Sequence, residues 1–383
     1  MPVAADPRFI SRTRQPGLDL LRAVAILLVV FYHAGLFGFA LPHDWQRFGW
    51  IGVDLFFVLS GYLIAGQLLT PIRRGERVEL ARFFGRRSLR ILPAYLAVLA
   101  VYFFLPAWRE FPTIPPAWKF LAFVQNLGLH GGTAFSHAWS LCVEAQFYLA
   151  LPLVLILLAR WKRGGLLLPV AVLLGGLLLR GLIAHYLTID GAIPFRGFQP
   201  LIYYATWSRL DPLVLGVALA AIEGFRPAWW SWFMRAAVWL WLPGLVAIAI
   251  GLWLGEGELS LALCLWQFPL IALGMALLLV CAVSPALPFQ RIEIPGMAFL
   301  ASIAYSVYLS HKLAIHAVQI WSGTHGILLT SAPAFAVLLL AIALTGMALF
   351  FAVERPFLQL RRRRLPRRAP GFDPGQALPP KVT

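Results

Sequence analysis

Long apolar runs recur along the whole chain and are separated by short polar segments. The runs are continuous rather than alternating, and each approaches the length of about 20 apolar residues that a helix needs to cross a bilayer. They predict ten membrane-spanning helices, at residues 18–38, 49–69, 91–107, 138–159, 165–187, 201–222, 236–254, 260–282, 297–320 and 331–353. The predicted fold class is therefore an all-α polytopic integral membrane protein.

Composition supports this class. Hydrophobic residues make up 60% of the chain and charged residues 13%, whereas soluble domains are about 45–50% apolar. The cysteines Cys142, Cys264 and Cys281 lie inside apolar runs without a CxxC spacing. We expect them to be buried thiols, and we expect neither a disulfide nor a bound metal.

The positive charge is distributed unevenly between the loops. The net charge is +16, and 24 of the 32 Lys and Arg residues fall in alternate polar segments, against four in the other segments. Such asymmetry follows the positive-inside rule and predicts both termini in the cytoplasm. The charge therefore predicts contact with membrane lipid and not with nucleic acid. The expected parts are a cytoplasmic segment at 1–17, a membrane domain at 18–357 and a basic, disordered cytoplasmic tail at 358–383.

Two charged side chains lie in the first predicted helix. Arg22 and His33 are eleven residues apart, which is close to three helical turns, so both lie on one face about 16 Å apart along the axis. An ionisable group within a span is costly and is a functional candidate. A snorkelling anchor is the structural alternative for Arg22, and a hydrogen bond within the bundle is the alternative for His33.

Other titratable groups are expected at the depth of His33. Asp54, Glu144, Asp211 and His311 come from four further predicted helices and all fall in the outer half of the membrane. Each alone has a structural explanation, but together they indicate a polar cavity that opens outward. On the opposite side, Arg22, Arg86, Arg87 and Arg90 are suited to the phosphates of an intracellular cofactor. The alternative is that the last three only obey the positive-inside rule.

Seven segments, taken in order, resemble the bacterial acyltransferase 3 family of membrane acyltransferases. They are Arg22 with His33, GVDLFFVLSGYL at 52–63, RRSLRILPAY at 86–95, HAWSLCVEAQFY at 137–148, RLDPLVLG at 209–216, YSVYLSHKL at 305–313 and ERPF at 354–357. The resemblance implies ten spans, a cytosolic acyl-CoA donor, and O-acylation of a hydroxyl near the outer face. The expected acyl group is acetyl, and the expected acceptor is a carbohydrate or lipid-linked glycan, although some relatives modify macrolides. The chain departs from the family at Ala145, where a second Glu commonly follows Glu144.

The resemblance and the depths together suggest catalytic roles. His33 is expected to act as general base, because the unperturbed pKa of histidine is about 6.5, with Asp54 or Glu144 orienting its ring. Arg22, Arg86, Arg87 and Arg90 are expected to bind the phosphates of CoA. The expected substrate cavity draws on a wider set, namely Ser60, Tyr62, His137, Trp139, Arg209, Asp211 and His311.

Two expectations within this set are more specific. Arg209 is expected to neutralise Asp211. Ser60 has no neighbouring base in the sequence that would activate it as a covalent nucleophile, so packing or cavity lining is its preferred role. A transporter or flippase that uses the buried charges as a substrate path is the alternative function.

Overall fold

The computed structural model describes residues 15–39, 44–159, 167–189, 192–291 and 294–365, and most of these residues are helical. They form no β-strand, only an isolated bridge between Ile189 and Ala192, which confirms the all-α prediction. The α-helices are α1 (Pro16–Leu36), α2 (Gly52–Arg73), α3 (Leu80–Phe104), α4 (Ala117–Leu121), α5 (Trp139–Ala159), α6 (Leu167–Leu187), α7 (Phe195–Phe198), α8 (Asp211–Phe225), α9 (Pro227–Leu254), α10 (Leu261–Val283), α11 (Met297–Thr324), α12 (Ala332–Leu349) and α13 (Arg355–Arg364). Short 3₁₀ or π segments are Asp44–Ile51, Pro106–Trp108, Ser136–Ala138, Gln199–Tyr203, Thr206–Ser208, Pro288–Gln290 and Phe350–Glu354.

Nine helical segments in the described part of the chain are long and apolar enough to cross a membrane. The expected span at 201–222 differs from the others because it is broken. It consists of the end of the π segment Gln199–Tyr203, a 3₁₀ turn and the 15-residue helix α8, and the single-turn α7 precedes it. Proline explains the interruptions: Pro200 and Pro212 have no N–H to donate, and Pro212 stands in the first turn of α8, where no donor is needed.

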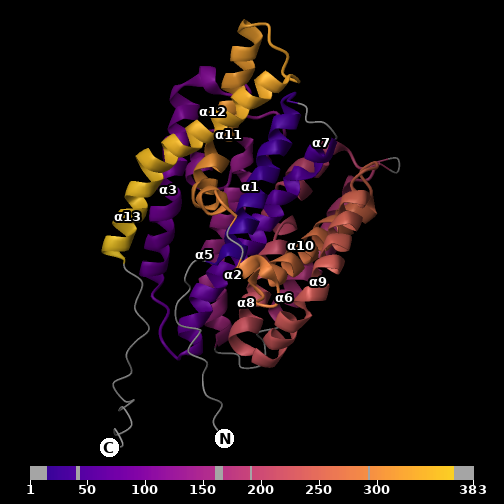
Figure 1. Ribbon diagram of the computed structural model, residues 1–383. Coiled ribbons are helices and arrows are strands. Elements are labelled where there is room, and N and C mark those ends of the chain that lie inside the picture. The colour runs from indigo at the N-terminus through magenta and orange to yellow at the C-terminus, as the bar shows by residue number, and fades with distance from the viewer. Residues whose placement is uncertain (1–14, 40–43, 160–166, 190–191, 292–293, 366–383) are drawn as a thin grey trace, which may run out of the picture.

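The helices form one bundle around α1 and α2 (Figure 1). Helix α2 packs against α8, and α9 packs against α10 on that side of the bundle. Helix α11 packs against α1 and α12, and α13 lies beside α3 on the other side (Figure 1). The end of α1, the starts of α2 and α5 and the middle of α11 meet inside this bundle.

Close packing of α2 and α8 depends on two glycines. A Cβ atom added at Gly61 would collide with the carbonyl oxygen of Leu213, and one added at Gly216 would collide with the backbone of Val58 and Tyr62. Small residues at such crossings let two backbones approach closely, which is a common way to join helices in membranes. These glycines lie in the segments GVDLFFVLSGYL and RLDPLVLG, so packing explains part of both motifs.

The last helix extends further than expected. A π turn at Phe350–Glu354 leads from α12 into α13, which continues to Arg364. Seven residues of the segment expected as a disordered tail, 358–364, are thus helical. Residues 1–14 of the expected N-terminal segment and residues 366–383 lie outside the described residues.

Candidate active site

A cavity of about 830 Å³ lies where α1 ends and α2 and α5 begin. This volume is in the range of small-molecule sites, which is about 300–1,000 Å³. Its wall is rich in aromatic side chains, with histidines and a few polar groups among them. The lining residues include Tyr32, His33, Trp50, His130, His137, Trp139, Arg196, Tyr203, Tyr204, Tyr308 and Lys312.

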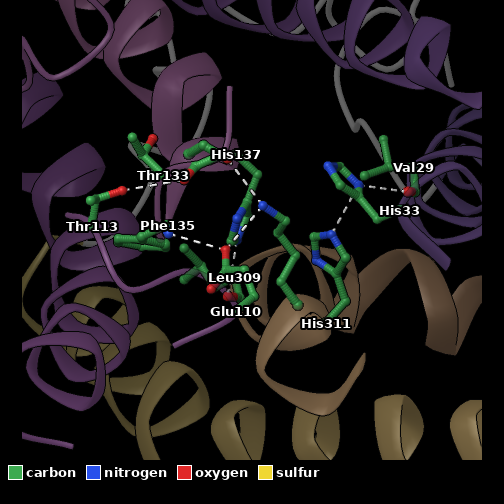
Figure 2. A network of polar contacts seen from close by, with 12 residues as sticks. Val29, His33, Glu110, Thr113, Thr133, Phe135, His137, Leu309 and His311 are labelled. Carbon is green, nitrogen blue, oxygen red and sulfur yellow. Dashed lines mark hydrogen bonds and ion pairs between the residues drawn. The ribbon is translucent and has the colours of Figure 1, made fainter. Parts of the chain in front are cut away.

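His33 meets a second histidine at this cavity (Figure 2). Its Nδ1 lies 2.9 Å from the carbonyl oxygen of Val29 and 3.2 Å from Nε2 of His311. His33 comes from the last turn of α1, and His311 from the middle of α11. The two helices therefore bring together residues that are 278 positions apart in the chain.

The contacts of the two rings indicate which nitrogens of His33 and His311 carry protons. Nδ1 of His311 lies 2.7 Å from the carbonyl oxygen of Tyr308, and a carbonyl can only accept, so this nitrogen is the donor. Nε2 of the neutral His311 ring is then an acceptor. Nδ1 of His33 faces that acceptor and the carbonyl of Val29, so it also carries its proton, which leaves Nε2 of His33 unprotonated.

Further charged groups surround the histidine pair. The ring of His137 lies 4.9 Å from that of His311, and its Nε2 lies 3.3 Å from the carbonyl oxygen of Leu309 (Figure 2). Next to it, the buried Lys312 forms an ion pair with Glu110 at 3.0 Å. Pairing keeps the cost of burying these two charges low. The cavity wall therefore combines imidazoles with a neutralised cation.

Tyr308 lines this cavity and also packs into the bundle. Its hydroxyl donates to the carbonyl oxygen of His137 at 2.7 Å and is 2.6 Å from Oγ of Ser140. The ring meets Phe56 edge to face at 6.3 Å. Tyr308 is 5% exposed, so its two hydrogen bonds and this ring contact fix it between the cavity and the interior of the bundle.

The carboxylates of Asp54 on α2 and Asp211 on α8 have partners other than those expected. Asp54 binds Nη2 of Arg209 at 2.9 and 3.0 Å, and Asp211 binds Nη1 of Arg180 at 2.5 Å; all four side chains are buried. The expectation that Arg209 neutralises Asp211 is therefore wrong. The reason is rotational: Asp211 opens α8 and faces α6, which carries Arg180, whereas Arg209 precedes the helix and faces α2. Asp54 is likewise bound to Arg209 and not to the ring of His33.

The Asp54–Arg209 pair supports the aromatic wall of the cavity. The guanidinium carbon of Arg209 lies 5.4 Å from the ring centre of Trp139 and 5.3 Å from that of Tyr203. It also lies 4.2 Å from Phe268, so aromatic faces enclose the cation on several sides. Trp139 and Tyr203 line the cavity on their other side.

Glu144 lies deeper in the bundle, with Ser60 and Tyr148. The hydroxyl of Ser60 donates to Oε1 of Glu144 at 2.6 Å, and that of Tyr148 donates to Oε2 at 2.8 Å. The base that Ser60 lacks in the sequence is thus supplied by α5. Arg87 stands over the ring of Tyr148 at 5.6 Å, which links this group to the arginines of α3.

The expected phosphate-binding arginines gather at the other end of the bundle. Arg22 pairs with Asp19 at 3.1 Å and interacts electrostatically with Arg90. Arg86 and Arg87 stand with Arg90 on the first half of α3, and each is partly buried. Helices α1 and α3 thus bring together the four arginines that the sequence singled out.

The expected substrate residues divide into two sets. His33, His137 and Trp139 line the cavity, and His311 contacts His33. Ser60 and Tyr62 do not line this cavity: the hydroxyl of Tyr62 donates to Glu223 at 2.7 Å and its ring stacks on Trp230. The roles of all these residues in catalysis stay predictions.

Sequence reasoning gave no role to two groups that matter here. Arg180 and Lys312 are cations within predicted spans, and that alone marked them as candidates, but nothing in the sequence named their partners. Among the described residues, no group of three or more His, Cys, Asp or Glu side chains is placed to hold a metal ion.

A family model and several known proteins match this chain. The acyltransferase 3 family model, described as an acyltransferase domain, matches residues 15–352. A peptidoglycan O-acetyltransferase of Listeria monocytogenes is 34% identical over 234 residues, which are 56% of this chain and 35% of that protein. An O-acetyltransferase of Staphylococcus aureus is 28% identical over 334 residues, or 80% of this chain and 50% of that protein. The chain thus spans half or less of these relatives, and no solved structure matches it.

Proposed function

The chain belongs to the acyltransferase 3 family, and we propose that it transfers an acetyl group from cytosolic acyl-CoA to a hydroxyl of a glycan at the outer face of the inner membrane. Two relatives are named as O-acetyltransferases, one of them for peptidoglycan. An aromatic cavity with few polar groups is suited to the apolar faces and hydroxyls of a sugar. The 24-to-4 charge asymmetry of the loops supports an outward position for this cavity.

One observation carries the mechanism: His33 lines the cavity, and its Nδ1 lies 2.9 Å from the carbonyl oxygen of Val29. This contact favours the tautomer in which Nε2 is unprotonated. In the proposed reaction, Nε2 accepts the proton of the acceptor hydroxyl while that oxygen attacks the thioester carbonyl. The C–O bond forms, the C–S bond breaks, and the proton finally passes to the CoA thiolate. The carbonyl of Val29 and Nε2 of His311 both accept from the Nδ1–H of His33, so they stabilise the imidazolium during the reaction.

The donor would approach from the end of the bundle that carries the arginines. Guanidinium groups bind phosphate through paired hydrogen bonds, so Arg22, Arg86, Arg87 and Arg90 suit the phosphates of CoA. Arg22 and His33 lie on the same face of α1, about 16 Å apart. That separation assigns them different tasks, phosphate binding and proton transfer.

The proposal is tested with purified protein, acetyl-CoA, and either a peptidoglycan fragment or a neutral oligosaccharide. Release of free CoA together with an acetylated glycan would support it. Replacing His33 with Ala should lower kcat by about 10²–10⁴-fold, the usual contribution of a general base. The matched control is His325→Ala, because His325 is exposed at the end of α11.

Two results would contradict the proposal. Full activity of the His33→Ala variant would exclude His33 as the base. A failure to consume acetyl-CoA with any glycan would favour the alternative, a transporter that carries the glycan itself.

A further inference from the structure

Helix α13 is held against the arginine-bearing start of α3. Nη1 of Arg86 donates to the carbonyl oxygen of Leu365 at 2.7 Å, where the chain leaves α13. The side chain of Leu365 also reaches Gly85, since a Cβ atom there would lie 3.1 Å from its Cδ1. Figure 1 shows α13 running along α3. The helix is therefore part of the same end of the bundle as the expected donor site.

This contact adds a fifth arginine to the group on α1 and α3. Arg361 interacts electrostatically with Arg90, Arg86 and Arg87, all cations. Within the described part of the chain, Arg87, Arg90 and Arg361 form no ion pair. Nε of Arg361 is buried and has no hydrogen-bond partner. A buried donor without a protein partner costs free energy, so this position favours a ligand that accepts a hydrogen bond.

Nearby carboxylates do not neutralise these cations. Glu354 accepts a hydrogen bond from Ser306 at 2.6 Å and interacts with Arg90 and Arg361 only at longer range. Glu144 binds Ser60, as described above, and is the other carboxylate that interacts with Arg87. The three guanidinium groups of Arg87, Arg90 and Arg361 thus interact with two carboxylates, so the cluster has an excess of positive charge that an anion would balance.

We propose that Arg361 completes a phosphate-binding site with Arg87 and Arg90, between α3 and α13. The inference rests on the proposed function, which makes the ligand the nucleotide end of acyl-CoA. An anionic phospholipid headgroup offers the same phosphate chemistry, and the experiment below separates the two sources. The arginines of α13 thereby have different surroundings. Arg361 is half-buried and faces the donor site, whereas Arg363 is exposed.

The test measures binding of CoA to the purified full chain, so it needs no transfer activity. Arg361→Gln should weaken CoA binding by about tenfold or more, the value of one hydrogen bond to a charged group. Arg361→Lys should recover part of the loss. The matched control, Arg363→Gln, removes the same charge from the same helix and should change CoA affinity less than about twofold.

A second measurement separates ligand binding from a structural role. Without CoA, Arg361→Gln removes repulsion between like charges, so its Tm should equal or exceed that of the unaltered protein. A lower Tm together with the weakened binding would make Arg361 structural and overturn the proposal. Equal CoA affinity of the two Gln variants would overturn it as well.

The lipid alternative is tested in two membranes, one of phosphatidylcholine alone and one that contains phosphatidylglycerol. An effect of Arg361→Gln on CoA affinity in both membranes supports the nucleotide as ligand. An effect only with phosphatidylglycerol assigns the site to lipid and overturns the donor assignment. If the unaltered protein binds CoA but transfers no acetyl group, the proposed function fails while the Arg361 inference stands.

Discussion

The Nδ1–H of His33 faces both the backbone carbonyl of Val29 and the imidazole of His311. Many general bases are oriented by a carboxylate, but Asp54 and Glu144 bind Arg209 and Ser60 here. His311 takes the orienting position instead. A neutral acceptor holds the His33 tautomer without placing a fixed negative charge in the low-dielectric interior.

The contact between His311 and His33 predicts a moderate loss of activity for His311→Ala. Losing one of two acceptors for the His33 N–H should lower kcat by about three- to tenfold, the value of one neutral hydrogen bond, with KM for the glycan unchanged. Steady-state kinetics at saturating acetyl-CoA measure this. A loss as large as that of His33→Ala would contradict the orienting role and place His311 in direct contact with the reaction.

Sequence patterns predicted which side chains lie within the spans, but not which neighbours they face. The constant rise per residue predicted one layer for His33, Asp54, Glu144 and His311. His33 and His311 are in contact, whereas Glu144 binds Ser60 and Tyr148 away from the cavity. Which neighbour each side chain faces depends on the rotation of every helix, and small residues far away set that rotation. The crossed pairs Asp54–Arg209 and Asp211–Arg180 could therefore not be read from the chain.

At the scale of elements, the contact between α2 and α8 predicts a difference between two glycines of one helix. Gly216→Ala would force α8 away from α2, at a cost of about 1–3 kcal/mol as for other overpacked sites. Gly224 has open space around it, so Gly224→Ala should leave stability unchanged or raise it, because Ala favours helix.

Thermal unfolding in detergent measures both variants. The Tm of the Gly216→Ala protein should fall by several degrees relative to that of Gly224→Ala. Equal values would mean that the helices can separate slightly without loss, and the glycines would then need another explanation than packing.

The interruption of the expected span at 201–222 was not predicted from the sequence. Hydropathy gave a continuous span at 201–222, since averaging over a window hides local interruptions. The prolines at 200 and 212 were visible signals of a break. Their structural result, a π turn and a 3₁₀ turn that place Tyr203 and Tyr204 in the cavity wall, depends on contacts with α5 and α6.

For the whole molecule, charge asymmetry predicts that the cavity and α13 face opposite sides of the membrane. His130 is exposed at the cavity and Gln359 is exposed on α13. In intact cells, an impermeant maleimide should label His130→Cys, whereas Gln359→Cys should react only after lysis. The native cysteines are buried and free, so they should give little background.

The opposite labelling pattern would invert the orientation and with it the sides proposed for donor and acceptor. Labelling of both positions in intact cells would show that the membrane had been breached, so a cytosolic marker protein serves as control.

The position of Tyr308 has a consequence for the energetics of the cell. A protein with polar groups accessible at both ends risks conducting protons down the gradient that drives ATP synthesis. Tyr308 lines the cavity and is held by two hydrogen bonds and by its contact with Phe56. In the proposed reaction an acetyl group would pass from the arginine-bearing end to this cavity. If it passes beside Tyr308, the membrane stays sealed to protons only when the ring moves while ligands fill the opening.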